Sequence, residues 1–188
     1  MRPGVLQWMA SLVACAVIPG CLLNSVHQIT TAPRTKPDPA HAIVVIGVGL
    51  DVMWPYTEFT LTLDEYSVEK QNITGSCFHY DRIDATRPST PAKVTYLAYE
   101  VPANAYVYSG RNANATLASS AMGRAFIAPG GATVYFGDYV LVGNKSVEFR
   151  RGIGAARSGA RSLLPHGAVL EPAESTTAAH APPLLCTP

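Results

Sequence analysis

The sequence predicts a mainly β protein, an antiparallel sandwich or partly open barrel with one short C-terminal helix. Gly and Pro number 15 each in 188 residues, and only 14% of the residues are charged, a composition that favours strands and turns. Short apolar or alternating segments separated by turn residues are typical of such folds. A helical stripe occurs in one stretch only, near the C-terminus. The length suits one domain with tails.

The strands are predicted from their period-two pattern, in order along the chain. Residues 43–48 form a continuous run rich in Ile and Val, as expected for a strand covered on both faces. In residues 59–63 apolar side chains alternate with threonine, so one face should pack inward and the other should meet water. The remaining predicted strands cover residues 93–101, 104–108, 124–128 and 132–142.

The segment Pro129-Gly130-Gly131 lies between the last two predicted strands. Both glycines tolerate positive φ, which tight turns require. The sequence therefore predicts a β-hairpin here.

A short helix is predicted at residues 153–164. Ala156 and Ala160 fall on one stripe with the leucines that follow, and Arg157 and Arg161 fall on another. Pro165 ends the pattern. We expect this helix to lie against the sheet.

Two polar, proline-rich segments flank the predicted domain, which covers residues 42–170. Residues 21–41 contain Pro33, Pro37 and Pro39 and are predicted to form an extended linker. Residues 171–188 are rich in Pro, Ala and Thr and are predicted to form a disordered tail.

The first twenty residues have the layout of a signal peptide. Arg2 precedes an apolar run over residues 5–18, and Pro19-Gly20 follows it. The run is shorter than the roughly 20 apolar residues of a membrane-spanning helix. Residues 1–20 are therefore predicted to be a signal peptide.

Two segments of this region resemble the lipobox of bacterial lipoproteins, in which aliphatic and small residues precede an acylated cysteine. They are Ile18-Pro19-Gly20-Cys21 and Leu12-Val13-Ala14-Cys15. Cleavage before Cys21 leaves a signal of normal length and a polar mature start, so Cys21 is the favoured lipid attachment site, with Cys15 as the alternative. An ordinary secretory signal with incidental cysteines is the third interpretation.

The resemblance implies cleavage before Cys21 and modification of this residue with acyl chains such as palmitate. Several acyl chains give stable membrane attachment. Leu22, where an Asp would retain the protein at the inner membrane, implies an outer-membrane location facing the periplasm.

The domain contains one candidate for a catalytic or metal site, the alternating residues Cys77, His79 and Asp81. A strand would project all three from one face, where they could act as nucleophile, base and orienting carboxylate, or as part of a metal site. Catalytic groups usually converge from different elements, and no paired Cys or His spacing accompanies them. A strand with a buried Cys and solvent-facing His and Asp is the simpler interpretation. We expect no enzyme activity, metal or cofactor.

The remaining cysteines suggest a disulfide. With Cys21 acylated and Cys15 in the signal, Cys77 and Cys186 could pair in an oxidising compartment. Two separate thiols are the alternative.

Charge is balanced overall but uneven along the chain. Without residues 1–20 there are 13 basic and 13 acidic residues, which argues against binding of nucleic acid. Residues 51–70 hold five acids against one base, and residues 145–161 hold five bases against Glu148. This asymmetry could serve partner docking or contact with anionic lipid head groups, or it could mark solvated faces.

The segment Ala128-Pro129-Gly130-Gly131, followed by apolar and aromatic residues 134–139, resembles small β-rich envelope lipoproteins of unassigned function. The sequence thus predicts a membrane-anchored envelope lipoprotein with a non-catalytic structural or partner-binding role, its partners being the membrane and another envelope protein. The alternative is an envelope hydrolase or metal-binding protein that uses Cys77, His79 and Asp81.

Overall fold

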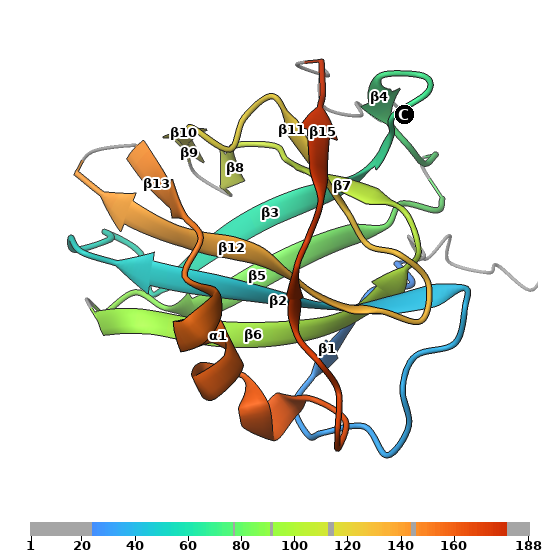
Figure 1. The fold of residues 1–188 in the computed structure, drawn as a ribbon. Coiled ribbons are helices and arrows are strands. Elements are labelled where there is room, and N and C mark those ends of the chain that lie inside the picture. Colours follow the sequence, from blue (N-terminus) through green and yellow to red (C-terminus); the bar gives the residue numbers. More distant parts are fainter. Residues whose placement is uncertain (1–23, 77, 91, 113–114, 144–145, 180–188) are drawn as a thin grey trace, which may run out of the picture.

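The described part of the chain forms two facing β-sheets with one short α-helix on the outside, a mainly β, sandwich-like fold as predicted (Figure 1). The computed structural model describes residues 24–76, 78–90, 92–112, 115–143 and 146–179. Most strand pairs are antiparallel, but the pair β2–β12 at the centre of the first sheet is parallel.

The first sheet has the order β1-β6-β2-β12-β13-β10, with β14 paired to β12. Its strands are β1 His27–Ile29, β2 His41–Leu50, β6 Ala92–Pro102, β10 Ala118–Ser119, β12 Thr133–Val142, β13 Ser146–Arg150 and β14 Glu171–Pro172.

The second sheet has the order β15-β11-β7-β3-β4, with β5 paired to β3. Its strands are β3 Glu58–Ser67, β4 Asn72–Ile73, β5 Arg82–Pro88, β7 Ala105–Tyr108, β11 Arg124–Ile127 and β15 Ser175–Thr177. A small separate pair joins β8 Arg111–Asn112 to β9 Ala115–Thr116.

The core lies between the sheets, and every predicted strand contributes to one sheet or the other. Val44, Ile46 and Val48 of β2 face the inward side chains of the second sheet, among them Phe59 and Leu61 of β3. The alternate residues of β2 are also buried, because the helix side of the sheet is covered. The prediction of a strand buried on both faces is therefore confirmed.

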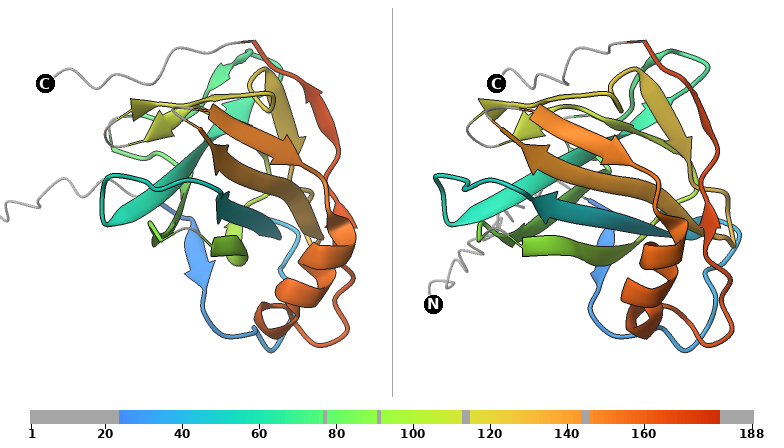
Figure 2. Two further views of the ribbon diagram at one scale, coloured as in Figure 1. Left: turned by 90° about the vertical axis from the view of Figure 1, so that its left-hand side faces the viewer. Right: turned by 60° about the vertical axis from the view of Figure 1, so that its left-hand side comes forward.

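The helix α1, Ile153–Gly159, packs on the outer face of the first sheet, against β2, β6 and β12 (Figure 2). Ala156 and Ala160 are fully buried there, while Arg157 and Arg161 are exposed, as the two predicted stripes require. A 3-10 turn, η1 (Arg161–Leu163), follows α1.

Strand β5 has a pattern that the sequence analysis missed. Ile83 and Ala85 are buried and alternate with polar residues, so the period-two signal is present. The hydroxyl of Thr62 on β3 donates to the Asp84 carboxylate on β5 over 3.0 Å, and Thr62 is buried. The threonine face of β3 is therefore less wet than predicted, because its hydroxyls bond to the neighbouring strand.

The predicted hairpin at Gly130-Gly131 is wrong. Strand β11, before the turn, pairs with β7 and β15 in the second sheet, whereas β12, after it, pairs with β2 in the first. The turn thus carries the chain between sheets. Gly131 does have the expected positive φ, at +74°, but the two flanking strands pair with other strands instead of with each other.

The folded unit also extends past the predicted limits of 42 and 170. Strand β1 pairs with β6, and β14 and β15 add to the edges of β12 and β11. Ala173 and Ala178 are buried. Residues 27–29 and 171–179 therefore belong to the sandwich rather than to a linker and a disordered tail, because exposed sheet edges provide backbone partners that polar composition does not reveal.

Candidate functional site

Only part of the site predicted from the sequence lies within the described residues. Cys77, the favoured lipid site Cys21, its alternative Cys15, and Cys186 all lie outside the described residues. His79 and Asp81 are described, in the segment that leads from β4 into β5.

Asp81 is buried, contrary to the expectation that it faces solvent, because both of its carboxylate oxygens have partners. His79 Nε2 lies 3.0 Å from Asp81 Oδ2, and the backbone N–H of Ser25 donates to Asp81 Oδ1 over 2.6 Å. Asp81 is 3% exposed, whereas the His79 side chain is 52% exposed. His79 and Asp81 are thus in contact, although they lie in the connection between β4 and β5 rather than on one face of a strand, and the Ser25 N–H occupies the other carboxylate oxygen.

A second set of bonds fixes the same segment. The side-chain amide of Asn24 donates to the Arg82 carbonyl over 2.9 Å, and the Arg82 N–H donates to Asn24 Oδ1 over 3.2 Å. We call Asn24, Ser25, Asp81 and Arg82 the N-terminal clamp. Its bonds join residues almost sixty positions apart and hold the start of the described chain on the second sheet.

The turn that carries His79 is organised by Ser76. The Ser76 hydroxyl accepts the N–H groups of Phe78 and His79, at 3.3 and 3.2 Å, and the Ser76 N–H donates to the His79 carbonyl over 2.6 Å. This compact turn leaves the ring of Phe78 70% exposed. Chemically, the Asp81 carboxylate could orient the His79 ring as an acidic residue orients a catalytic base. The same carboxylate also accepts the Ser25 N–H of the N-terminal clamp.

Two further carboxylates are buried. Tyr80 donates its hydroxyl to Asp64, and burial together with this carboxylate raises the pKa of Tyr80 to about 12. On the opposite sheet, a bulge at Gly137 turns Asp138 toward the helix side, where Tyr96 donates to it over 3.4 Å. Burial raises the pKa of the Asp138 carboxyl.

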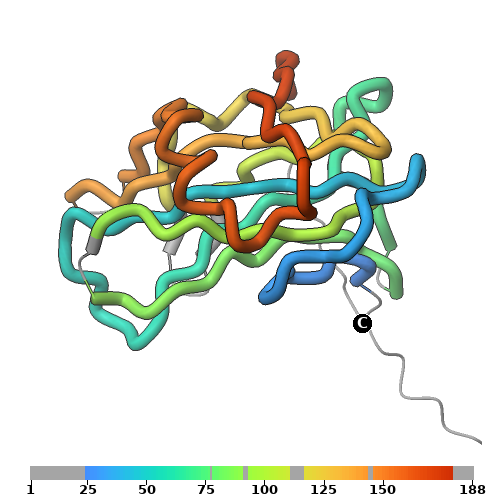
Figure 3. The backbone as a smooth tube through the Cα atoms, turned by 60° about the horizontal axis from the view of Figure 1, so that its bottom comes forward, coloured from blue at the N-terminus to red at the C-terminus, as the bar shows by residue number. Residues whose placement is uncertain are grey.

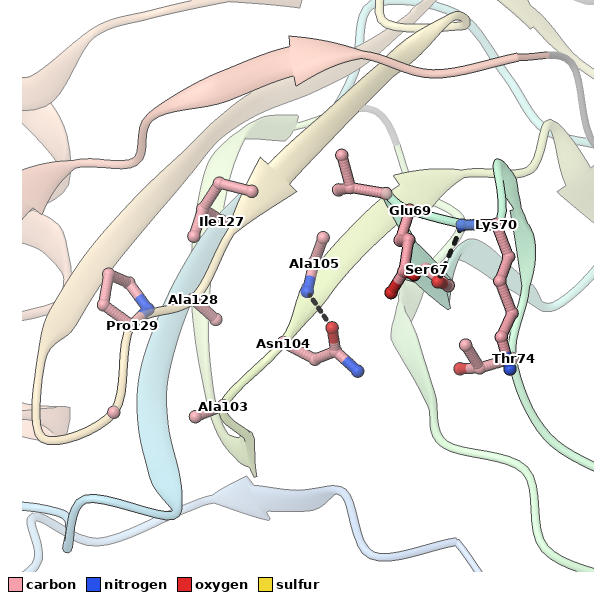
Figure 4. Close-up of a pocket in the computed structure, with 12 residues that line it drawn as sticks. Ser67, Glu69, Lys70, Thr74, Ala103, Asn104, Ala105, Ile127, Ala128 and Pro129 are labelled. Carbon is pink, nitrogen blue, oxygen red and sulfur yellow. Dashed lines mark hydrogen bonds between the residues drawn. The ribbon is translucent and has the colours of Figure 1, made fainter.

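A shallow groove of about 520 Å³ lies between the β3–β4 turn and the segments that flank β7 and β11 (Figure 4). Lys70 and Thr74 lie on one side and Ile127 and Pro129 on the other. Glu69 and Lys70 give the groove one charge of each sign. The Asn104 side chain already has protein partners, because its Oδ1 accepts the Ala105 N–H over 2.9 Å and its amide donates to Glu65 of β3. This groove has no marked chemical character.

A second cavity, of about 830 Å³, has a strongly basic lining. It lies between the β1–β2 connection and the chain from α1 to β14, two segments that run side by side below the helix in Figures 2 and 3. We call it the arginine pocket. The residues that line it are Ala32, Pro33, Arg34, Arg157, Arg161, Leu164, Pro165, His166, Gly167, Ala168, Val169 and Leu170. Three arginines and a histidine thus surround it, without an acidic residue among the lining set.

Sequence analysis noted the basic stretch 145–161 but predicted no pocket from it, and the structure divides that stretch. Arg150 pairs with Glu148 at 2.6 Å, and Arg151 donates to the Ala173 carbonyl at 2.7 Å. Arg157 and Arg161 reach the pocket, where Arg34 joins them from a segment assigned to the linker.

Within the described ranges, no group of three His, Cys, Asp or Glu residues is arranged to hold a metal ion. None of the helices described there is long and apolar enough to cross a membrane.

Comparison with known proteins adds no relative to this geometry: no family model, no curated protein and no solved structure matches the chain.

Proposed function

We propose that the chain is an envelope lipoprotein, cleaved before Cys21 and attached through acyl chains on that residue to the outer membrane, facing the periplasm. Its folded part has a non-catalytic role, structural or in binding another envelope protein. The observation that carries the proposal is the N-terminal clamp, which lies only a few residues from the proposed anchor.

The clamp limits the distance between sandwich and lipid. Asn24, the first described residue, bonds to Arg82 at both its amide atoms, and Ser25 bonds to Asp81. Asn24 is the third residue after Cys21, and three residues span at most about 10 Å. An acylated Cys21 would therefore hold the sandwich against the bilayer, without the long spacer that residues 21–41 would have provided.

The side chains beside the clamp suit such a position. The exposed ring of Phe78 belongs to the turn that precedes Asp81 and could enter the membrane interface, where apolar rings are stabilised. A domain held close to the membrane over a defined face is suited to a fixed role in the envelope.

The same geometry supports a non-catalytic role for His79 and Asp81. In a triad the carboxylate serves to orient the base. Here Asp81 also receives the Ser25 N–H at 2.6 Å, so its loss would release the N-terminal segment. Holding the N-terminal segment is therefore a sufficient structural reason for the buried Asp81 and its contact with His79.

The attachment is tested by labelling cells with a radioactive fatty acid. We expect Cys21→Ser to abolish the label and to leave uncleaved precursor, because the thiol of Cys21 is the acyl acceptor. Cys15→Ser is the matched control and should be labelled normally. Normal labelling of the Cys21→Ser protein would overturn the proposal.

A further inference from the structure

We propose that the arginine pocket binds a phosphate-bearing anion. The site goes beyond the envelope role above and does not depend on acylation of Cys21.

The first argument is charge. Arg34, Arg157 and Arg161 approach one cavity from the β1–β2 connection, α1 and η1. Arginine is permanently charged, and an anion placed between the three exposed guanidinium groups would be attracted by all of them at once. The ion pairs found among the described residues involve other cations, at His41, His79, Arg82 and Arg150. The positive charge of the pocket is therefore not neutralised by a described carboxylate.

The second argument is geometry. The Nε of Arg157 donates to the Leu170 carbonyl over 3.0 Å, which fixes the guanidinium at the wall while its terminal nitrogens have no described protein partner. Leu164 and Leu170 are buried in the apolar cluster beneath α1 and give the pocket a packed floor. A cationic group on a fixed support binds with less loss of conformational entropy than one on a mobile chain.

The third argument selects phosphate among anions. Guanidinium groups donate paired hydrogen bonds, and a phosphate group offers several acceptor oxygens to more than one arginine at once. A single carboxylate has two oxygens and one charge, which would leave part of the cluster unneutralised. His166 adds a further donor at the rim.

The size of the pocket indicates that the phosphate belongs to a larger molecule. About 830 Å³ lies in the range of small-molecule sites. Val169, 65% exposed, also provides an apolar contact at the edge of the pocket. A lipid head group and a soluble phosphorylated compound share this chemistry.

The experiment uses the full chain, purified in a neutral detergent, and follows thermal unfolding by tryptophan fluorescence. A ligand that binds the folded state raises the melting temperature. One arm adds sodium pyrophosphate, with sodium chloride at equal ionic strength as its reference. The other arm adds phosphatidylglycerol to the micelles, with phosphatidylcholine at equal mole fraction as its reference.

Two charge-matched double variants assign any effect to the pocket. Arg34→Gln with Arg161→Gln removes two lining cations that have no described structural bond. Lys93→Gln with Arg124→Gln removes two exposed cations elsewhere. We expect the pocket variant to weaken the apparent affinity by about tenfold or more, because charge-assisted bonds are lost, and the control to match the wild type. Arg157→Lys keeps the charge but loses the planar fork, and should also bind more weakly.

A pocket-dependent response to pyrophosphate would identify a soluble phosphate compound as the ligand. A response confined to phosphatidylglycerol would identify a lipid head group. The proposal is overturned if neither probe raises the melting temperature, or if the pocket variant responds as the wild type does. Because neither arm requires an acylated cysteine, this failure would be distinct from failure of the labelling experiment.

Discussion

Single residues decide how closely segments of this sandwich approach one another. A Cβ on Gly130 would lie 1.8 Å from the Pro39 carbonyl oxygen, so only glycine allows the 37–41 segment to lie against the turn. The neighbouring Gly131 donates its N–H to the carbonyls of Asp38 and His41, at 2.9 and 2.8 Å. The two glycines thus hold the chain that enters β2, and their role differs from the hairpin predicted for them.

Replacing either glycine by alanine should destabilise the protein. Gly130→Ala forces backbone atoms apart, and Gly131→Ala places a Cβ at a φ of +74°. Each change is expected to lower the free energy of unfolding by about 1–3 kcal/mol, as for other strained or overpacked positions. Denaturant melts of the purified variants provide the measurement.

Gly154→Ala is the matched control for these variants. Its Cβ would meet no atom within 4 Å, and alanine favours helix α1, so stability should be unchanged or increased by up to about 1 kcal/mol. If all three variants unfold with the wild type, the close contact between the turn and Pro39 does not exist in solution.

At the residue scale the sequence singled out His79 and Asp81 as residues that a strand would project from one face, but it favoured solvent exposure for both, and the structure buries Asp81. Spacing within one segment gives the relative direction of two side chains. It carries no information on Ser25, which is more than fifty residues away and takes the other carboxylate oxygen.

At the scale of elements, the least expected feature is the ordered C-terminal segment. Strand β14 pairs with β12, and β15 pairs with β11. Between and after them, the N–H groups of Ala173 and Ala178 donate to the carbonyls of Tyr135 and Gly123, each over 2.9 Å. The segment therefore covers edges of both sheets.

We expect the hydrogen-bonded amides of the segment 171–179, among them those of Ala173 and Ala178, to be protected from hydrogen exchange. Amides in paired strands exchange only when the pairing opens, whereas those of a disordered tail exchange as in a free peptide. Mass spectrometry of the peptide that covers this segment, compared with the same peptide after unfolding, gives the result. Equal exchange in the two states would mean that β14 and β15 are absent and that the tail begins at residue 171.

Sequence periodicity predicted most elements because it reports which side chains turn inward. Ala156 and Ala160 of the helix region and Phe59 and Leu61 of β3 are buried as their spacing requires. Short edge strands such as β1 and β15 have no such signal, since most of their side chains are exposed and their order comes from backbone pairing.

At the scale of the whole molecule, both ends of the described chain are held by the region from the end of β3 to the start of β5. Ser25 bonds to Asp81 at one end, and at the other the Ala179 N–H donates to the hydroxyl of Tyr66 over 2.9 Å. Strand β4 and the turn organised by Ser76 belong to the same region, with Cys77 next in the chain.

This arrangement leads to a prediction about the disulfide between Cys77 and Cys186. Cys186 is seven residues beyond Ala179, and seven residues reach at most about 25 Å. We expect mass spectrometry of unreduced peptides from the exported protein to recover the linked pair. Cys186→Ser should then lower the free energy of unfolding by about 2–4 kcal/mol, because the bridge restricts the unfolded chain.

The control is Cys15→Ser, which changes a residue of the proposed signal peptide and should leave both the linked peptides and the stability unchanged. Quantitative alkylation of Cys77 and Cys186 without reductant would contradict the bridge.

The sequence by itself determined the mainly β class, the inward faces of the central strands and the two stripes of the helix, because each follows from hydrophobic spacing within a few residues. Only the tertiary structure decided that β2 runs parallel to β12, that the turn at Gly130 connects two sheets, and that Arg34 joins Arg157 and Arg161 around one cavity. The parallel pair and the arginine pocket join segments about ninety or more residues apart, and the turn connects two sheets because β11 pairs with β7 and β15 instead of β12. Strand pairing and shared cavities arise from backbone edges and surfaces that meet only once the chain has folded, and local side-chain patterns do not encode which edges will meet.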